Sequence, residues 1–112
     1  MAQTYNFTID AGSRCVVVFA VTVDWLSDLT GYSARGTVRA SQLATASLLL
    51  DLSPFLAVNV AEDTVTLDLP ADTSAAFTWE AGQYDVEIFD GNADHDVRVV
   101  QGRIGVDREV TV

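Results

Sequence analysis

Short runs of β-branched, aromatic and aliphatic residues alternate with clusters of Gly, Asp, Asn and Ser along the whole chain. This alternation is typical of β-strands separated by tight turns. Turn signals recur at a spacing of roughly eight to twelve residues, which favours a β-sandwich of about seven to nine short strands. The sequence predicts strands at 5–9, 14–23, 32–40, 48–52, 56–60, 64–69, 83–89 and 97–106, with a short strand or tail at 109–112.

Two of these segments arrange their apolar residues differently. Segment 14–23 is apolar at four consecutive positions, 16–19, so we expect a central strand that is covered on both faces. Segment 32–40 instead alternates between small or apolar residues and polar ones, which predicts a strand with one buried and one exposed face. Arg35 and Arg39 both lie on the polar face of that strand. They are therefore candidate polar anchors for a partner, or simply part of a solvated strand face.

One segment, 70–77, has the features of a short helix, with a proline at its start, an early aspartate and several alanines. Segment 90–94 reads as a hairpin turn. Gly102 and Gly105 predict bulges or close backbone approaches within the last strand. No linker, repeat or low-complexity stretch interrupts the chain. We therefore expect one all-β domain over 1–112, an antiparallel sandwich with at most this one helix.

The composition adds an acidic surface to this picture. The 112 residues are 49% hydrophobic with a mean hydropathy of +0.24, which argues against disorder. Sixteen acidic residues against six arginines, with no lysine, give a formal net charge of −10 and a pI near 4.1. Nucleic-acid binding and docking to anionic membranes both need basic residues, so we expect neither. The charge serves solubility, or pairs with a basic partner.

Cysteine and targeting signals add little. Cys15 is the single cysteine, so we expect no intramolecular disulfide and no cysteine-based metal cluster. The first residues lack the basic and apolar regions of a signal peptide, and the longest apolar run, 15–21, is seven residues, too short to span a bilayer. We therefore expect the chain to be made in a cytoplasm, with no signal peptide and no transmembrane segment.

The sequence offers no catalytic group to pair with its single histidine. His95 lies in a turn crowded with acids, and no nucleophile elbow or glycine-rich phosphate loop is present. Because a nucleophile and its base are the minimum for covalent catalysis, the sequence predicts that the protein is not an enzyme.

The turn around His95 resembles the start of a calcium-binding loop. Four oxygen-bearing side chains alternate in it: Asp90, Asn92, Asp94 and Asp96. The sixth position, which should be Gly, is His95, and the twelfth, which should be Glu, is Gln101. An Asp-Gly hairpin turn accounts for the same residues. We keep these four residues as a weak candidate calcium site and expect no other cofactor.

Four aromatic residues are candidates for a binding surface: Trp25, Phe55, Phe77 and Trp79. Exposed, they would form a platform on which a carbohydrate stacks. Buried, they would plug the ends of the sandwich or anchor a protein interface. The sequence does not decide between the carbohydrate platform and the buried role.

Three segments carry a resemblance to a known family. They are 28–35 (Asp-Leu-Thr-Gly-Tyr-Ser-Ala-Arg), 81–88 (Ala-Gly-Gln-Tyr-Asp-Val-Glu-Ile) and 99–111, which ends in Glu-Val-Thr. In this order they resemble small tailed-phage virion proteins, similar to the N-terminal domain of phage baseplate upper proteins, over about 5–112. The resemblance implies an immunoglobulin-like sandwich that serves as a structural subunit of the tail, baseplate or fibre-attachment region, such as a minor tail protein. A capsid decoration protein is a further possibility.

Two functional hypotheses follow. In the first, the chain is a virion structural protein that docks on other virion proteins and forms homo-oligomers, since virion positions are symmetric. Its interface candidates are Arg35, Arg39, Trp25, Phe55 and Trp79. In the second, it is a carbohydrate- or receptor-binding module of a virion. There, Trp25 or Trp79 and the acidic turn bind a host glycan, with or without calcium.

Overall fold

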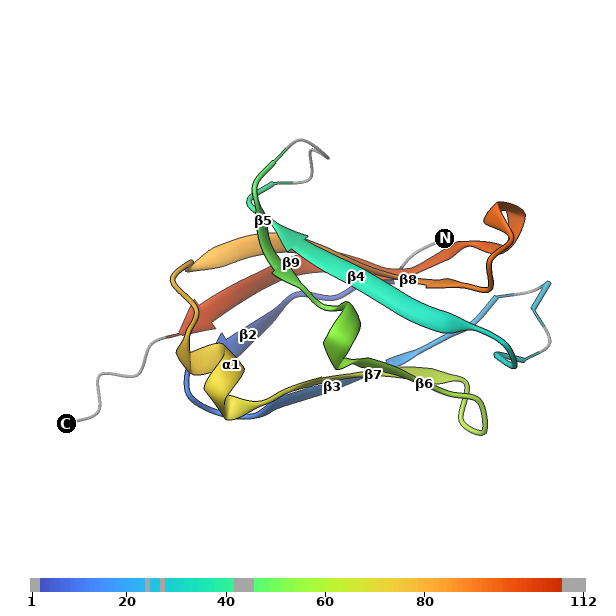
Figure 1. Ribbon diagram of the computed structural model, residues 1–112, viewed down its shortest axis with the longest axis horizontal. Helices are drawn as coiled ribbons and strands as arrows, with labels where there is room; N and C mark the ends of the chain where they lie inside the picture. The colour runs from blue at the N-terminus through green and yellow to red at the C-terminus, as the bar shows by residue number, and fades with distance from the viewer. Residues whose placement is uncertain (1–2, 24, 27, 42–45, 108–112) are drawn as a thin grey trace.

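The computed structural model describes residues 3–23, 25–26, 28–41 and 46–107, and these form two packed β-sheets (Figure 1). The larger sheet has the strand order β1-β9-β8-β4-β5, with β2 also paired to β9, and the smaller has the order β3-β7-β6. The strands are β1 (Gln3–Thr4), β2 (Phe7–Asp10), β3 (Cys15–Ala20), β4 (Ser33–Arg39), β5 (Leu48–Asp51), β6 (Leu56–Asn59), β7 (Thr64–Leu69), β8 (Ala81–Phe89) and β9 (Val97–Asp107). A short helix, α1 (Ala71–Ala75), and two 3₁₀ turns, η1 (Ser53–Phe55) and η2 (Ala93–His95), complete the described residues.

The core lies between the two sheets and is built by strict alternation. In β7 and β8, every second residue points inward and is buried, while the residues between them are only half-buried. The buried apolar side chains of the described residues are Ile9, Phe19, Leu29, Val38, Leu52, Val65, Leu67, Leu69, Tyr84, Val86, Ile88, Val99, Val100 and Ile104. Both sheets contribute to this set, so the predicted β-sandwich is confirmed.

The predicted elements agree with the structure in most places. Helix α1 lies inside the predicted segment 70–77, and β7 has the predicted bounds. The alternation of β4 is also as predicted, with Val38 buried and Arg35 exposed. The predicted strand or tail at 109–112 lies outside the described residues. No helix among the described residues is long and apolar enough to cross a membrane.

The pairing is antiparallel except at the N-terminus, where β1 and β2 run parallel to β9. Parallel neighbours need a long crossover connection rather than a hairpin. Here nearly the whole chain serves as that connection, because the first strands pair with the last. As a result, Gln3 lies opposite Val100, and the N-terminal segment meets the β8–β9 hairpin.

The expectation that segment 14–23 forms a central strand covered on both faces is wrong. Among the described strands, β3 pairs only with β7, so it forms one edge of the smaller sheet. Val17 and Phe19 point into the core, whereas the side chains of Val16 and Val18 are 51% and 58% exposed. A continuous apolar run is compatible with burial on both faces, but periodicity alone does not establish it.

The last strand contains a bulge, although not at the glycines where one was expected. The pairing of β8 with β9 shifts between Val86 and Glu87, so that Val99 is an extra residue and both Val99 and Val100 are buried. Gly102 is a close-approach point, because a Cβ there would collide with the carbonyl oxygen of Tyr5. Gly105 is not, since a Cβ there would lie 3.7 Å from the nearest atom.

That close approach also explains why the predicted strand 5–9 is wrong at its start: β1 ends before the predicted segment, β2 begins at Phe7, and 5–6 between them are not strand. The Tyr5 amide donates to the Gln101 carbonyl at 2.9 Å, but the Asn6 side chain then accepts from the Arg103 amide at 2.8 Å. The Tyr84 hydroxyl donates to the Tyr5 carbonyl at 2.6 Å. Side-chain hydrogen bonds thus replace the regular ladder beside Gly102, and burial raises the pKa of Tyr84.

Candidate binding surfaces

A groove opens at one end of the sandwich, where the β3–β4 connection meets the β8–β9 hairpin. It has a volume of about 970 Å³ and is lined by the chain at 20–23 and 97–99 together with Gln3, Trp25, Asp94 and Asp96. In Figure 1 this end lies on the right, opposite helix α1. We call it the loop-end groove. It brings together one predicted interface residue, Trp25, and two residues of the acidic turn.

Trp25 is exposed although the connection that carries it is anchored in the core. Leu29 in that connection is 1% exposed, and the Asp28 carboxylate accepts a hydrogen bond from the Thr30 amide at 2.9 Å. The Trp25 side chain itself is 58% exposed. Its indole lies 6.0 Å from the His95 ring, measured between centroids and tilted by 39°. The segment 28–30 that follows is therefore anchored, while the Trp25 indole stays in solvent at the rim of the groove.

The predicted calcium residues make hydrogen bonds within the hairpin. The Asp90 carboxylate accepts from the Asn92 amide at 3.0 Å, and its other oxygen lies 2.8 Å from His95 Nδ1. The Asn92 side chain accepts from the Asp94 amide at 3.1 Å. The hydrogen bond from His95, followed by the one from the Asn92 amide, lowers the pKa of Asp90. Gly91 makes the turn possible, because its φ of +97° is favoured only by glycine.

These four residues do not form a ligand cluster in the structure. Among the described residues, no group of three or more His, Cys, Asp or Glu is placed to hold a metal ion. Asp96 is already engaged in an ion pair, because one of its oxygens lies 3.2 Å from Arg35 Nη2. Calcium binding at Asp90, Asn92, Asp94 and Asp96 therefore stays a prediction without a preformed site.

The outer face of the larger sheet carries Arg35, which already has several partners there. Its guanidinium forms ion pairs with Glu87 and Asp96 and lies 4.3 Å from the centroid of the Phe89 ring. Exposed ion pairs of this kind contribute roughly 0–1 kcal/mol each. Arg35 would therefore have to exchange existing partners to anchor another protein.

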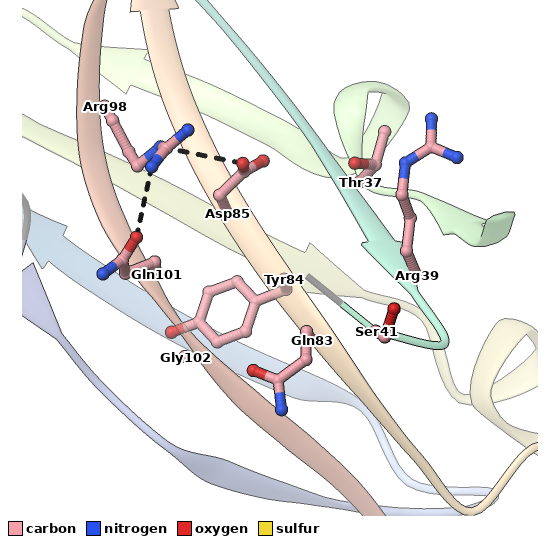
Figure 2. Close-up of a pocket in the computed structure, with 9 residues that line it drawn as sticks. All are labelled: Thr37, Arg39, Ser41, Gln83, Tyr84, Asp85, Arg98, Gln101 and Gly102. Carbon is pink, nitrogen blue, oxygen red and sulfur yellow. Dashed lines mark hydrogen bonds and ion pairs between the residues drawn. The ribbon is translucent and has the colours of Figure 1, made fainter. Parts of the chain in front are cut away.

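Arg39 lies on the same face, four residues along β4 or about 13 Å away. Its Nη1 donates to the Ala46 carbonyl at 3.0 Å. Figure 2 shows it at one side of a polar depression of about 400 Å³ that Arg98 borders on the other. Arg98 lies 3.7 Å from the Asp85 carboxylate and 3.3 Å from the Gln101 side-chain oxygen. The two predicted anchors, Arg35 and Arg39, therefore do not form one site.

Phe55 and Trp79 pack against the core. Phe55 belongs to η1 and is half-buried against the core cluster. Trp79 lies between α1 and β8, at the end opposite the loop-end groove. Its ring centroid is 4.9 Å from that of Phe77, and both rings pack against the core. Of the aromatic interface candidates, only Trp25 is free to serve as a platform.

The smaller sheet presents a surface that sequence reasoning missed. We call it the valine face: Val16 and Val18 of β3 with Thr66, which lies opposite Val18 on β7. At its end, Arg14 pairs with Asp68 at 2.7 Å, and this hydrogen bond lowers the pKa of Asp68. A signal was present in the sequence, because the polar positions of segment 64–69 predict that one face of this sheet is exposed. The apolar run at 16–19 nevertheless led to the prediction that both faces of segment 14–23 are buried.

Neither a family model nor a curated protein matches the sequence. Solved structures do match, 114 chains in all. One is the crystal structure of a chicken TCR, with a TM-score of 0.57 and 12% sequence identity. The match covers 95% of this chain, which spans 54% of that TCR chain.

The likeness establishes an immunoglobulin-like fold, and at this identity it carries no function. The order β9-β8-β4-β5 facing β3-β7-β6 agrees with it. Antibody domains join their two sheets by a disulfide, which a chain with Cys15 as its single cysteine has no partner to form. Burial raises the pKa of this thiol, which packs against the core. Apolar packing therefore holds the sheets together without a covalent link.

Proposed function

We propose that this domain is a non-enzymatic structural subunit of a phage virion, in the tail, baseplate or fibre-attachment region, that acts by docking on another virion protein. The turn and tail motifs at 28–35, 81–88 and 99–111 support the virion setting, and the immunoglobulin-like fold is the one that the resemblance implies. The observation that carries the docking function is the valine face on an edge strand.

Edge strands that are not meant to pair are usually blunted by charge, proline or a bulge. On β3, the outward positions Val16 and Val18 are instead more than half exposed. No described strand pairs with the second edge of β3. Gln3 caps only its end, by donating from Nε2 to the Ala20 carbonyl at 2.8 Å. Within the part of the chain that the structure describes, no other hydrogen bond occupies this edge of β3, so its backbone can pair with an added strand, and the valines supply apolar area for it.

The charge around this face favours a basic partner chain over a second copy. Asp10 and Asp68 lie close enough to Cys15 to raise the pKa of its thiol further. A second copy would bring the same carboxylates and a formal charge of −10 to the interface. A strand with apolar residues facing Val16 and Val18 and a basic residue near Asp10 complements the face instead, since Asp68 is already paired with Arg14. Several copies of this chain are then arranged by the symmetry of the virion, and not by contacts between their valine faces.

The first test asks whether the chain is part of the particle. Mass spectrometry of purified virions of the encoding phage should find it in a fixed ratio to the major virion proteins. Cryo-electron microscopy of the same particles then distinguishes the tail end from the capsid, where it would be a decoration protein. Absence from purified virions would overturn the proposal.

The second test addresses the valine face. The double variant Val16→Lys/Val18→Lys should lower incorporation into virions at least tenfold, because two lysines block strand addition. The matched control is Val60→Lys, since Val60 is also exposed, at 44%, but lies outside β3. All three proteins should unfold within about 0.5 kcal/mol of one another. Normal incorporation of the double variant would rule out this face, whereas self-association of the isolated protein that the lysines abolish would identify a second copy as the occupant.

A further inference from the structure

We propose that the loop-end groove binds a neutral oligosaccharide. The inference goes beyond the proposed docking function and does not depend on it, because the groove and the valine face use different residues. It rests on a groove of ligand size, an exposed indole at its rim and several polar side chains with hydrogen-bonding capacity left over.

The indole of Trp25 gives the groove an apolar platform. A large aromatic side chain that is 58% exposed is unusual, since aromatic rings normally contribute most of their area to a core. The C–H face of a pyranose ring is apolar and carries partial positive charge, which complements the negative face of an aromatic ring. Stacking of one sugar ring on Trp25 would bury this exposed area and place the next ring in the groove.

The polar lining of the groove is rich in acceptors. The Asp94 carboxylate has no partner among the described residues, and only one oxygen of Asp96 is paired, with Arg35. Gln3 donates its amide N–H to Ala20, which leaves its side-chain carbonyl available. Sugar hydroxyls can donate to each of these oxygens, and Arg98 can donate in return. Such a set suits a polyhydroxylated ligand better than an apolar one.

The same charges determine which sugars fit. Two carboxylates in the groove, on a chain with a formal charge of −10, repel sialylated, phosphorylated or uronic-acid sugars. The ligand class is therefore a neutral oligosaccharide. Calcium is not required, because the Asp90 and Asn92 oxygens already accept hydrogen bonds within the hairpin. Of the two tryptophans, Trp25 is the one that can stack on a sugar, since Trp79 packs against the core at the opposite end of the sandwich.

The test is isothermal titration calorimetry of the purified chain against soluble hexasaccharides. The neutral probes are malto-, cello- and mannohexaose and hexa-N-acetylchitohexaose, and the anionic probe is hexagalacturonic acid. At least one neutral probe should bind saturably, the anionic probe should not bind, and excess chelator should change nothing. Failure of all four neutral probes, binding of the anionic probe alone, or loss of binding on chelation would overturn the proposal.

Variants tie the binding to the groove. Trp25→Ala should weaken binding of the neutral probe at least tenfold, and Asp94→Asn should weaken it severalfold. Glu80→Gln is the matched control, because it removes an exposed carboxylate at the opposite end of the sandwich and should bind like wild type. Unchanged binding by Trp25→Ala would overturn the proposal. Val16→Lys/Val18→Lys should bind the probe normally, so a failure of the sugar site and a failure of the docking face are distinguishable.

Discussion

The two ends of the sandwich each carry a tryptophan, and they use it in opposite ways. At the helix end, Trp79 packs with Phe77 against the core, at a ring-centroid distance of 4.9 Å. At the loop end, Trp25 is 58% exposed above a groove. The same residue type thus closes one end of the core and leaves the other end with an accessible aromatic surface. A tryptophan packed on the core contributes to stability, whereas an exposed one leaves apolar area in contact with solvent.

The helix end is further fixed by a buried serine. Ser74 of α1 is 0% exposed, and its hydroxyl accepts from the Gly12 amide at 2.9 Å. The same hydroxyl lies 3.0 Å from the Ser13 carbonyl and 3.1 Å from the Ala71 carbonyl, to which it can donate. One side chain therefore joins α1 to the β2–β3 turn across the end of the sandwich. The side-chain hydrogen bonds within the turn 90–95 of the loop-end hairpin are instead exposed, such as the one between Asp90 and His95.

The largest expected effect compares the two tryptophans directly. Trp79→Ala should lower the free energy of unfolding by about 3 kcal/mol, since it removes a large ring packed on the core. Trp25→Ala should change it by no more than about 0.5 kcal/mol, because the indole is mostly in solvent. Denaturant unfolding of both variants measures the difference. Equal losses, or a larger loss for Trp25, would contradict this difference between the two tryptophans.

A smaller effect is expected at Ser74. Ser74→Ala removes the acceptor of the Gly12 amide, and losing a hydrogen bond of this kind at a part-buried position lowers the free energy of unfolding by about 0.5–1.5 kcal/mol. Ser13→Ala is the matched control, since that side chain is exposed in the adjoining turn and should change stability little. Hydrogen exchange of the Gly12 amide should become faster in Ser74→Ala alone. Unchanged exchange would mean that the turn does not depend on α1.

The fold could be predicted where local periodicity decides the outcome. Segments 32–40 and 64–69 alternate with period two, and such a pattern determines which side chains face a core whatever the partner strand is. Segment 14–23 could not be resolved in this way, because an apolar run does not reveal whether a strand is central or at an edge. Whether a strand is central or at an edge depends on whether a second strand pairs with it, and that pairing is decided by the whole chain.

The candidate sites depended still more on long-range pairing. No local pattern distinguishes Trp25 from Trp79, since their burial is decided by which elements close each end. Gln3 reaches the loop-end groove because β1 pairs in parallel with β9, at the other end of the sequence. Arg98 borders both the groove and the polar depression, and the bulge at Val99 shifts the pairing beside it. Sequence reasoning therefore found Trp25 and the acidic turn but not their neighbours.

The smallest expected effect concerns the hairpin that borders the groove. The pKa of Asp90 is lowered by the hydrogen bond from His95, so the folded state favours the ionised carboxylate. A lowered folded-state pKa stabilises the protein above the ordinary Asp value of about 3.9, and the contribution is lost as the pH falls through the folded-state value. Asp90→Asn should therefore melt at a slightly lower temperature than wild type near neutral pH, and this difference should disappear in strong acid.

Circular dichroism melts at about pH 7 and about pH 2 measure the difference in melting temperature, with Glu80→Gln as the control. If the difference in melting temperature between wild type and Asp90→Asn persists in acid, the stabilisation comes from the shape of the Asp90 side chain and not from its charge.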